Sequence, residues 1–339
     1  MKLFHAVPIT GNIRENISIF AIGEVFVSKF LPDLVQNASP STAVEIEGFG
    51  LIHVAGPDAD KFLQGQLTCD LNELKQDNWL FGGHCDAKGK LWSVFRALRS
   101  EHGVYLLQPT STIAASLAQL QKFGVFSKVE ITDASSLHRY ILVLGQDAEE
   151  QVSAMTGIEP SQQHEQVQDI HVLQVAEHAY LLVLPASFKV QGQLNHQSWW
   201  QALHIEQGWP WLGTEHQGEF VPQMVNLDKI GGINFKKGCY IGQETVARMH
   251  YKGQNKRRLM RLEGHTDSLP TASDQLEVQI GENWRRAGAV ISAVRYDNEV
   301  VAIQAVLPDE LEQTAKLRIK GQESSSFTPC SHTDENGTK

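Results

Sequence analysis

The sequence predicts an α+β fold in which two successive α/β halves are followed by a small β-barrel or sandwich. The chain has 339 residues and a hydrophobic fraction of 42 %, which is enough to bury more than one core. Between residues 42 and 255, short apolar strands alternate twice with segments of helical periodicity. From residue 256 onward the chain changes to short runs rich in β-branched residues and separated by turns.

The first predicted half comprises residues 42–135. Strands are expected at 51–54, 91–95 and 104–107. Helices are expected directly after Asp58 and over 110–122. Asp58 can cap the first of these helices because its carboxylate can accept hydrogen bonds from free amide groups of the first turn.

The second predicted half comprises residues 136–255 and repeats this alternation. Strands are expected at 140–144 and 180–184, and helices at 148–155 and 198–206. The helix at 198–206 is stopped by Gly208 and Pro210. The comparable order of elements in the two halves suggests an internal duplication.

The remaining segments flank these two halves. Residues 1–41 are expected to be an extension with little core of its own, and residues 256–321 the barrel domain. Residues 322–339 are rich in Ser, Thr, Asp and Gly, so a disordered tail is expected there. Cys330 falls in this tail, which argues against an active-site role for it.

Composition limits the classes of function. The formal net charge is −10, so nucleic acid and acidic membranes are repelled unless a local basic patch compensates. The four cysteines form no CxxC pair, which argues against a zinc ribbon and for reduced thiols in the cytoplasm. No stretch approaches the roughly 20 apolar residues of a membrane helix, and the amino terminus lacks a secretory signal pattern, so no membrane partner is expected.

The octapeptide Lys237-Gly-Cys-Tyr-Ile-Gly-Gln-Glu244 is the strongest functional candidate. Gly238 permits positive φ or a close backbone approach beside Cys239. A helix is expected over 243–249, and its dipole together with Lys236 and Lys237 would favour a thiolate at Cys239. The structural alternatives are a buried apolar cysteine, glycines that only shape a turn, and a basic run that is simply a solvated face.

Charge and aromatic residues gather near this motif. Eight Lys or Arg residues and one acid, Glu244, lie between Lys236 and Arg261. Four tryptophans (Trp199, Trp200, Trp209 and Trp211) form a cluster on which a flat heteroaromatic ligand could stack, although core packing is the commoner use of tryptophan.

Gly65, in a helical pattern, indicates a close approach of a ligand or a neighbouring element. His84 and Cys85 have no partner at metal-ligand spacing, so no permanent metal is expected.

The octapeptide resembles the signature of the YgfZ family of folate-binding proteins. The resemblance covers roughly residues 43–306 and continues in four further motifs, which are His84-Cys-Asp-Ala-Lys-Gly-Lys90, Phe126-Ser-Lys-Val129, Ile205-Glu-x-Gly208 and Gly231-Gly-Ile-x-Phe-Lys-Lys237. The family is related to the aminomethyltransferase (T-protein) of the glycine cleavage system. The resemblance therefore implies two ferredoxin-like α/β subdomains and a C-terminal β-barrel around an opening that binds tetrahydrofolate.

The resemblance also implies a function. Bacterial members are linked to tRNA modification, including methylthiolation by an iron–sulfur enzyme, and mitochondrial relatives help to assemble or maintain [4Fe–4S] clusters. The expected cofactor is tetrahydrofolate or a folate derivative, and the expected partners are iron–sulfur enzymes such as the tRNA methylthiotransferase. The functional thiol is expected at Cys239 within a motif of Lys237, Gly238, Tyr240, Gly242, Gln243 and Glu244.

Four positions compare with family functional residues. Two family tryptophans that contact folate correspond to Trp200 and Phe49, and the phenylalanine keeps a stacking face but lacks the indole N–H. The catalytic aspartate of the aminomethyltransferases corresponds to Ser93, which has no acid to transfer a proton. An arginine of those enzymes corresponds to His204.

Three functions remain open from the sequence. The first is a folate-binding accessory protein for tRNA modification and iron–sulfur enzymes, acting through Cys239. The second is a folate-dependent one-carbon transferase or demethylase with a carboxylate such as Asp86 in place of Ser93. The third is direct RNA binding through the basic run, which the net charge and the lack of an RNA-binding module make the weakest.

Overall fold

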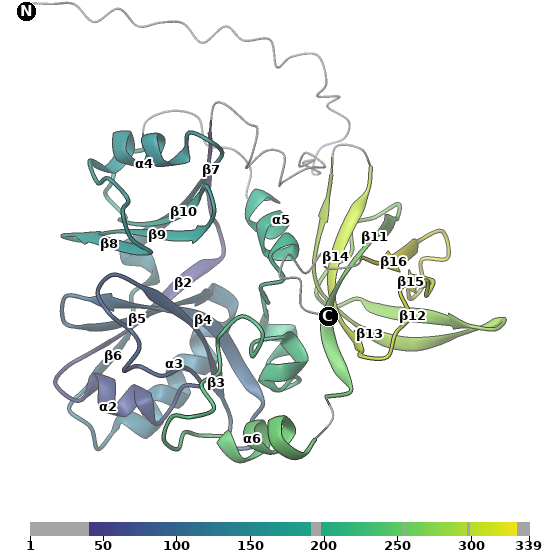
Figure 1. Ribbon diagram of the computed structural model, residues 1–339, viewed down its shortest axis with the longest axis horizontal. Helices are drawn as coiled ribbons and strands as arrows, with labels where there is room; N and C mark the ends of the chain where they lie inside the picture. The colour runs from purple at the N-terminus through teal and green to yellow at the C-terminus, as the bar shows by residue number, and fades with distance from the viewer. Residues whose placement is uncertain (1–40, 191–197, 254, 297–298, 331–339) are drawn as a thin grey trace, which may run out of the picture.

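The computed structural model describes residues 41–190, 198–253, 255–296 and 299–330 (Figure 1). Two five-stranded sheets lie on one side of the molecule, and a closed six-stranded barrel lies on the other. Helix α5 (Ser198–Glu206) stands between the sheets and the barrel (Figure 1). The predicted α+β architecture with a C-terminal barrel is confirmed. Within the described residues, no helix has both the length and the apolar character needed to cross a membrane.

The first sheet has the strand order β3-β4-β5-β2-β6. Its elements are β2 (Phe49–Ala55), α2 (Ala59–Gln64), β3 (Trp79–Cys85), β4 (Leu91–Ser100), β5 (Gly103–Pro109), α3 (Thr110–Gly124) and β6 (Glu130–Asp133). All its pairings are antiparallel, and Leu51 lies opposite Leu107. The ferredoxin-like order is recovered when β3 is counted as an additional edge strand.

The second sheet repeats this arrangement with the order β1-β7-β10-β9-β8. Its elements are β1 (Thr42–Glu45), β7 (His138–Leu144), α4 (Ala148–Thr156), β8 (His164–Val167), β9 (Ile170–Ala176) and β10 (Ala179–Pro185). Strand β1 occupies the edge that β6 occupies in the first sheet, with Thr42 opposite Leu144. The sequence pattern places β1 in the first half, whereas its hydrogen bonds place it in the second sheet.

The barrel has the strand order β11-β14-β13-β12-β15-β16. Its strands are β11 (Arg257–His265), β12 (Gln275–Ile280), β13 (Asn283–Arg295), β14 (Val301–Pro308), β15 (Leu317–Ile319) and β16 (Ser326–Pro329). Strand β16 corrects the predicted tail at 322–339, because its backbone pairs with β11 and β15 and the Phe327 side chain is buried in the barrel. The sequence gives little sign of this short strand, because Phe327 is a single apolar residue among polar ones. The last part of the predicted tail, 331–339, and the predicted extension up to residue 40 lie outside the described residues.

The connecting elements are η1 (Ser135–Leu137), η2 (Thr214–His216), η3 (Pro222–Val225) and α6 (Gln243–Lys252). The largest core cluster joins both sheets, α5 and the barrel, and smaller clusters lie beneath α2 and α3, beneath α4, and inside the barrel. The predicted cap of α2 is wrong: the carboxylate of Asp58 accepts a hydrogen bond from the Lys128 amide at 2.8 Å and makes no cap bond to the helix.

Candidate functional site

The octapeptide runs as an irregular segment into α6, and Gly242 forms the bend between them. Gly242 has φ +83°, and a methyl group on it would lie 2.5 Å from the carbonyl oxygen of Asp86 and 2.8 Å from Cα of Gly89. Gly89 also has positive φ, at +75°. The Asp86–Gly89 turn and the octapeptide therefore pack against each other at Gly89 and Gly242.

Gly238 differs from what the sequence predicts. It is exposed, it is absent from the glycines with positive φ, and a methyl group on it would meet no atom within 4 Å. The conformational requirement of the motif therefore rests on Gly242 and not on Gly238.

Lys237 anchors the octapeptide to the first subdomain. Its buried ammonium donates to the carbonyl oxygens of Leu67 at 2.7 Å and Cys69 at 2.6 Å, and lies 5.2 Å from the centre of the Tyr240 ring. Burial lowers the pKa of Lys237. The sequence assigned this cation to Cys239, but its hydrogen bonds are made to the two carbonyl groups.

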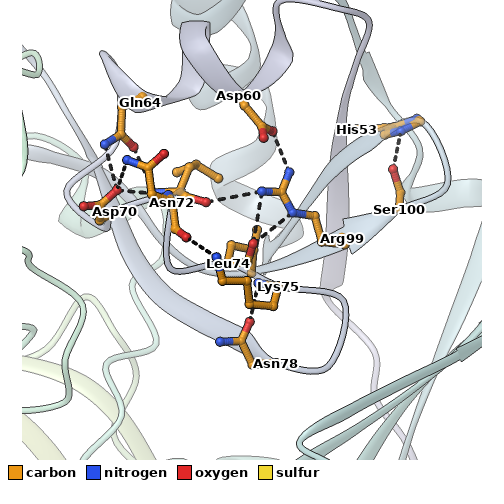
Figure 2. A network of polar contacts seen from close by, with 11 residues as sticks. His53, Asp60, Gln64, Asp70, Asn72, Leu74, Lys75, Asn78, Arg99 and Ser100 are labelled. Carbon is orange, nitrogen blue, oxygen red and sulfur yellow. Dashed lines mark hydrogen bonds and ion pairs between the residues drawn. The ribbon is translucent and has the colours of Figure 1, made fainter.

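The carbonyl groups that accept hydrogen bonds from Lys237 belong to a loop that side-chain hydrogen bonds hold in place (Figure 2). Gln64 donates to Asp70 at 2.8 Å and accepts from the Leu71 amide at 2.8 Å. Arg99 of β4 donates to the carbonyl oxygens of Leu71 and Leu74 and to the carboxylate of Asp60. These contacts fix the loop between α2 and β3, which explains how it can hold the octapeptide in place.

Backbone contacts complete this attachment. The Ile241 amide donates to the carbonyl oxygen of Gly65 at 3.1 Å, and the Asn234 amide donates to that of Thr68 at 2.9 Å. Gly65 stands at the C-terminal end of α2. The octapeptide thus reaches the backbone of Gly65, but a methyl group on Gly65 would meet only the carbonyl oxygen of Phe62 at 3.5 Å, so this contact does not require glycine.

Cys239 is the exposed cysteine among four thiols, all of which the structure describes. Burial raises the pKa of Cys69 to about 12, of Cys330 to about 11, and of Cys85 further still. A buried thiol with a raised pKa is poor in thiolate, the reactive form. The octapeptide therefore presents the most exposed of the four thiols, while Tyr240 beside it is buried.

A second candidate site is an aromatic cluster between the two sheets, α5 and the barrel. The ring centre of Phe49 lies 5.5 Å from that of Trp200 and 5.2 Å from that of Trp211. The ring centre of His204 lies 4.5 Å from that of Trp200, and its Nδ1 donates to the carbonyl oxygen of Trp209 at 3.2 Å. The structure thus brings Phe49 and Trp200 together, as the family resemblance implies.

Arg96 of β4 is the charged centre of this cluster. Its guanidinium carbon lies 4.6 Å from the ring centre of Phe81, 4.7 Å from that of Trp209 and 5.2 Å from that of Trp200. Burial lowers the pKa of Arg96 to about 9, and no carboxylate among the described residues pairs with it. Its polar neighbour is the ring of His204, whose pKa is lowered by burial and then by the Arg96 charge.

Several buried polar atoms here lack a hydrogen-bond partner among the described residues. Among them are Nε of Arg96 and Nε1 of Trp200. Arg96 and His204 line a cavity of about 10 Å³, which is room for about one water. Unpaired buried groups cost free energy, so this set is suited to a polar ligand or bound water.

Ser93 does not face this cluster. Neighbouring side chains of β4 alternate between faces, and Val94 and Leu98 belong to the central core while Phe95 and Ala97 pack beneath α2 and α3. Ser93 is buried on the second of these faces, 3.5 Å from the hydroxyl of Ser116 in α3. The structure also places the Asp86 carboxylate elsewhere, since it accepts from the Lys88 and Lys90 amides within its turn.

Strand β3 connects the two candidate sites. Phe81 near its middle contacts Arg96, and Cys85 at its end leads into the turn that packs against Gly242. A strand rises about 3.3 Å per residue, so the aromatic cluster and the octapeptide are separated by about 13 Å along β3. Among the described residues, no group of three or more His, Cys, Asp or Glu side chains is placed to hold a metal ion.

Sequence reasoning missed Arg96. A signal for Arg96 was present, since an arginine in the middle of the apolar run 91–98 cannot alternate to solvent if both faces of the strand are covered.

Comparisons with known proteins agree with this architecture. Residues 255–322 match the family model described as "YgfZ, beta-barrel domain". The chain is 38 % identical over 301 residues to the tRNA-modifying protein YgfZ of Serratia proteamaculans (strain 568), covering 85 % of this chain and 91 % of that protein. It is 39 % identical over 315 residues to the tRNA-modifying protein YgfZ of Colwellia psychrerythraea (strain 34H / ATCC BAA-681), covering 90 % and 96 %.

The fold is also similar to that of the glycine cleavage system aminomethyltransferase T from Bartonella henselae. The TM-score is 0.66 at 17 % sequence identity, and the match covers 86 % of this chain and 85 % of that chain. At this identity the similarity establishes the shared fold alone.

Proposed function

Since this chain belongs to the YgfZ family, we propose that it supports tRNA modification and that the thiol of Cys239 is the group through which it acts. The observation that carries the proposal is the contrast within the octapeptide. Lys237 and Tyr240 are buried and Lys237 is hydrogen-bonded to the first subdomain, whereas Cys239 between them is exposed. A loop fixed in this way holds a reactive atom in a defined position toward a partner.

Tetrahydrofolate or a related folate is the proposed ligand of the aromatic cluster. A pterin is flat and carries hydrogen-bond donors and acceptors, which suits the rings of Phe49 and Trp200 and the unpaired nitrogen atoms of Arg96 and Trp200. The cavity of about 10 Å³ is far smaller than such a ring, so binding requires aromatic side chains to move aside. Bound tetrahydrofolate would supply a carrier for one-carbon units.

The proposed partners are iron–sulfur enzymes, including the tRNA methylthiotransferase, in the cytoplasm. This part of the proposal is supported by the family resemblance and by the accessible position of Cys239.

Complementation of a deletion strain tests the role of the thiol. Cys239→Ser and Cys239→Ala should fail to restore tRNA methylthiolation, measured by mass spectrometry of nucleosides from total tRNA. Cys330→Ser is the matched control and should restore it, because Cys330 lies half-buried in the barrel. Full rescue by both Cys239 variants would remove the thiol from the function.

Calorimetric titration with tetrahydrofolate tests the ligand. Trp200→Phe removes the unpaired indole N–H, keeps an aromatic ring and should weaken binding by about tenfold or more. Trp284→Phe is the control, because Trp284 lies in the barrel against Arg318. Unchanged affinity of the Trp200 variant would place folate outside the cluster.

A one-carbon transferase remains the second candidate because the aminomethyltransferase fold is shared. None of the described residues that line the cavity carries a carboxylate, so the geometry favours the accessory role. Formation of methylene-tetrahydrofolate from an aminomethyl donor by the purified protein would reverse this preference.

A further inference from the structure

We propose that α6 and the two residues Phe235 and Lys236 form a binding surface for single-stranded RNA beside Cys239. This α6 surface consists of Phe235, Lys236, Arg248, His250, Tyr251 and Lys252. The proposal rests on the proposed function in tRNA modification and adds that this chain contacts RNA itself.

Three aromatic rings gather on the α6 surface. Phe235 stacks on His250 with ring centres 3.7 Å apart and planes 14° from parallel. Tyr251 packs edge-on against His250 at 4.7 Å and remains 66 % exposed. Unpaired bases of single-stranded nucleic acids stack on exposed aromatic rings of this kind, whatever their sequence.

Cations surround these rings. Lys236, Arg248 and Lys252 are exposed, and their side chains form no hydrogen bond or ion pair with any described residue. The acid of α6 is Glu244, in the first turn. In a chain of net charge −10, unpaired cations concentrated on one helix indicate an anionic partner.

Most of α6 is exposed to solvent. Val246 is the buried residue of α6, so most of the helix faces away from the core. A shallow hollow of about 430 Å³ runs along it and is lined by Glu244, Ala247, Arg248, Tyr251 and Lys252. In Figure 1, α6 lies at the lower edge of the molecule, away from the second sheet.

The segment that contains Cys239 runs alongside the α6 surface. Phe235 contacts the last turn of α6, and Gly242 begins its first turn, so the segment with Cys239 must run back along the helix. Ten helical residues span about 15 Å, the length of a few stacked nucleotides. A strand of RNA bound on Tyr251 and Lys252 therefore passes within reach of the thiol.

RNA fits the α6 surface better than other anions. An acidic peptide would use the cations but would leave the three rings unexplained. A membrane would require a broad apolar face, and the exposed part of α6 is mainly charged and aromatic.

Fluorescence anisotropy with the full chain tests the proposal. The probe is a labelled single-stranded RNA of about 12 nucleotides, titrated at low and moderate salt, with the same sequence as a duplex for comparison. Tyr251→Ala should weaken Kd about 5- to 100-fold through lost stacking. Lys252→Ala should weaken binding at low salt and reduce the salt slope by about 0.7.

Matched controls come from another exposed part of the chain, at the C-terminal end of α3. Phe126 is 99 % exposed and Lys122 is an exposed cation, so Phe126→Ala and Lys122→Ala remove the same chemistry and should leave Kd unchanged. The proposal is overturned if the wild type does not bind the single strand at low salt, if it binds the duplex equally well, or if all four variants match the wild type. Loss of tRNA methylthiolation in the Cys239 variants is measured separately, so each idea can fail without the other.

Discussion

Within the octapeptide, the backbone requires glycine at Gly242 but not at Gly238. Gly242→Ala forces positive φ on an alanine and drives its methyl group into the Asp86–Gly89 turn. The strain alone should lower the free energy of unfolding by about 1–3 kcal/mol, measured by urea denaturation.

Gly238→Ala is the internal control, because its methyl group would meet no atom within 4 Å. We expect its stability to stay within about 0.5 kcal/mol of the wild type. Equal destabilisation by the two substitutions would contradict the geometry described at Gly242. A stable Gly238 variant that fails in complementation would show that a partner approaches the chain there.

Arg96 is expected to lower the stability of the fold and to contribute to binding of the ligand. Its guanidinium is buried among aromatic rings without a carboxylate partner in the described part of the chain. Arg96→Met keeps the volume and removes the uncompensated charge, so the midpoint of thermal unfolding should stay the same or rise. The same variant should lose affinity for tetrahydrofolate, measured by calorimetry.

A fall of several degrees in the unfolding temperature of Arg96→Met would show that the guanidinium stabilises the core. Phe81→Leu, which removes one of the rings beside Arg96, is the comparison for loss of packing alone.

The sequence indicates candidate residues but not the atoms that they contact. Motifs single out Cys239, Phe49 and Trp200, and the structure places the thiol at the surface and the two rings 5.5 Å apart. The cation of Lys237 was assigned to the thiol, whereas it bonds carbonyl groups about 170 residues away in the chain. Local spacing contains no information about such distant partners.

At the scale of elements, the β8–β9 hairpin contains a buried histidine pair. Nε2 of His164 and Nδ1 of His171 are 3.0 Å apart, and the rings are stacked. Burial lowers the pKa of His164 to about 4 and of His171 to about 3. His171 also contacts Tyr105 of β5, so the pair lies where the two sheets meet.

This pair should make the protein sensitive to acid. The folded-state pKa values lie below the unfolded value of about 6.5, so stability is complete above pH 6.5 and falls as the unfolded chain takes up protons between pH 6.5 and about 4. At pH 5 each histidine should account for about 2 kcal/mol of lost unfolding free energy, measured by urea denaturation at pH 7.5 and pH 5.

The double variant His164→Gln with His171→Gln should lose less stability between these two pH values than the wild type. His102→Gln is the control because His102 is exposed, and it should keep the wild-type difference. An unchanged difference in the double variant would assign the acid sensitivity to other groups, such as buried His84.

Elements with strong local patterns were predicted closely. The helix expected at 110–122 is α3 (Thr110–Gly124), and the one expected at 198–206 has those bounds. Strand β16 was missed, because a strand of four residues with a single buried side chain is defined by its partners rather than by its own periodicity.

At the scale of the whole molecule, the barrel is joined to the sheets by a polar contact through α5. Tyr296 of the barrel donates to the carboxylate of Glu206, which also pairs with Arg261. Burial raises the pKa of Glu206, although Arg261 and Tyr296 act against this shift. Tyr296→Phe should cost about 1–3 kcal/mol, because a buried carboxylate loses a donor.

Limited proteolysis would localise this effect. The Tyr296 variant should be cut sooner between the sheets and the barrel, while Tyr251→Phe, at an exposed position, should behave as the wild type. Equal rates for both variants would mean that the hydrogen bond from Tyr296 to Glu206 does not hold the barrel in place.

The duplication suggested by the sequence is visible as one strand order used twice, but the contribution of β1 to the second sheet is not predictable from pattern. Strand β1 bonds to β7 about a hundred residues later, so it stays without its partner until the whole first half has been synthesised. When the chain emerges from the ribosome, the five strands of the first sheet can pair with one another while the edge of β1 is still free. The second half therefore depends on a strand that is made before the first half, whereas the first half is complete without the second.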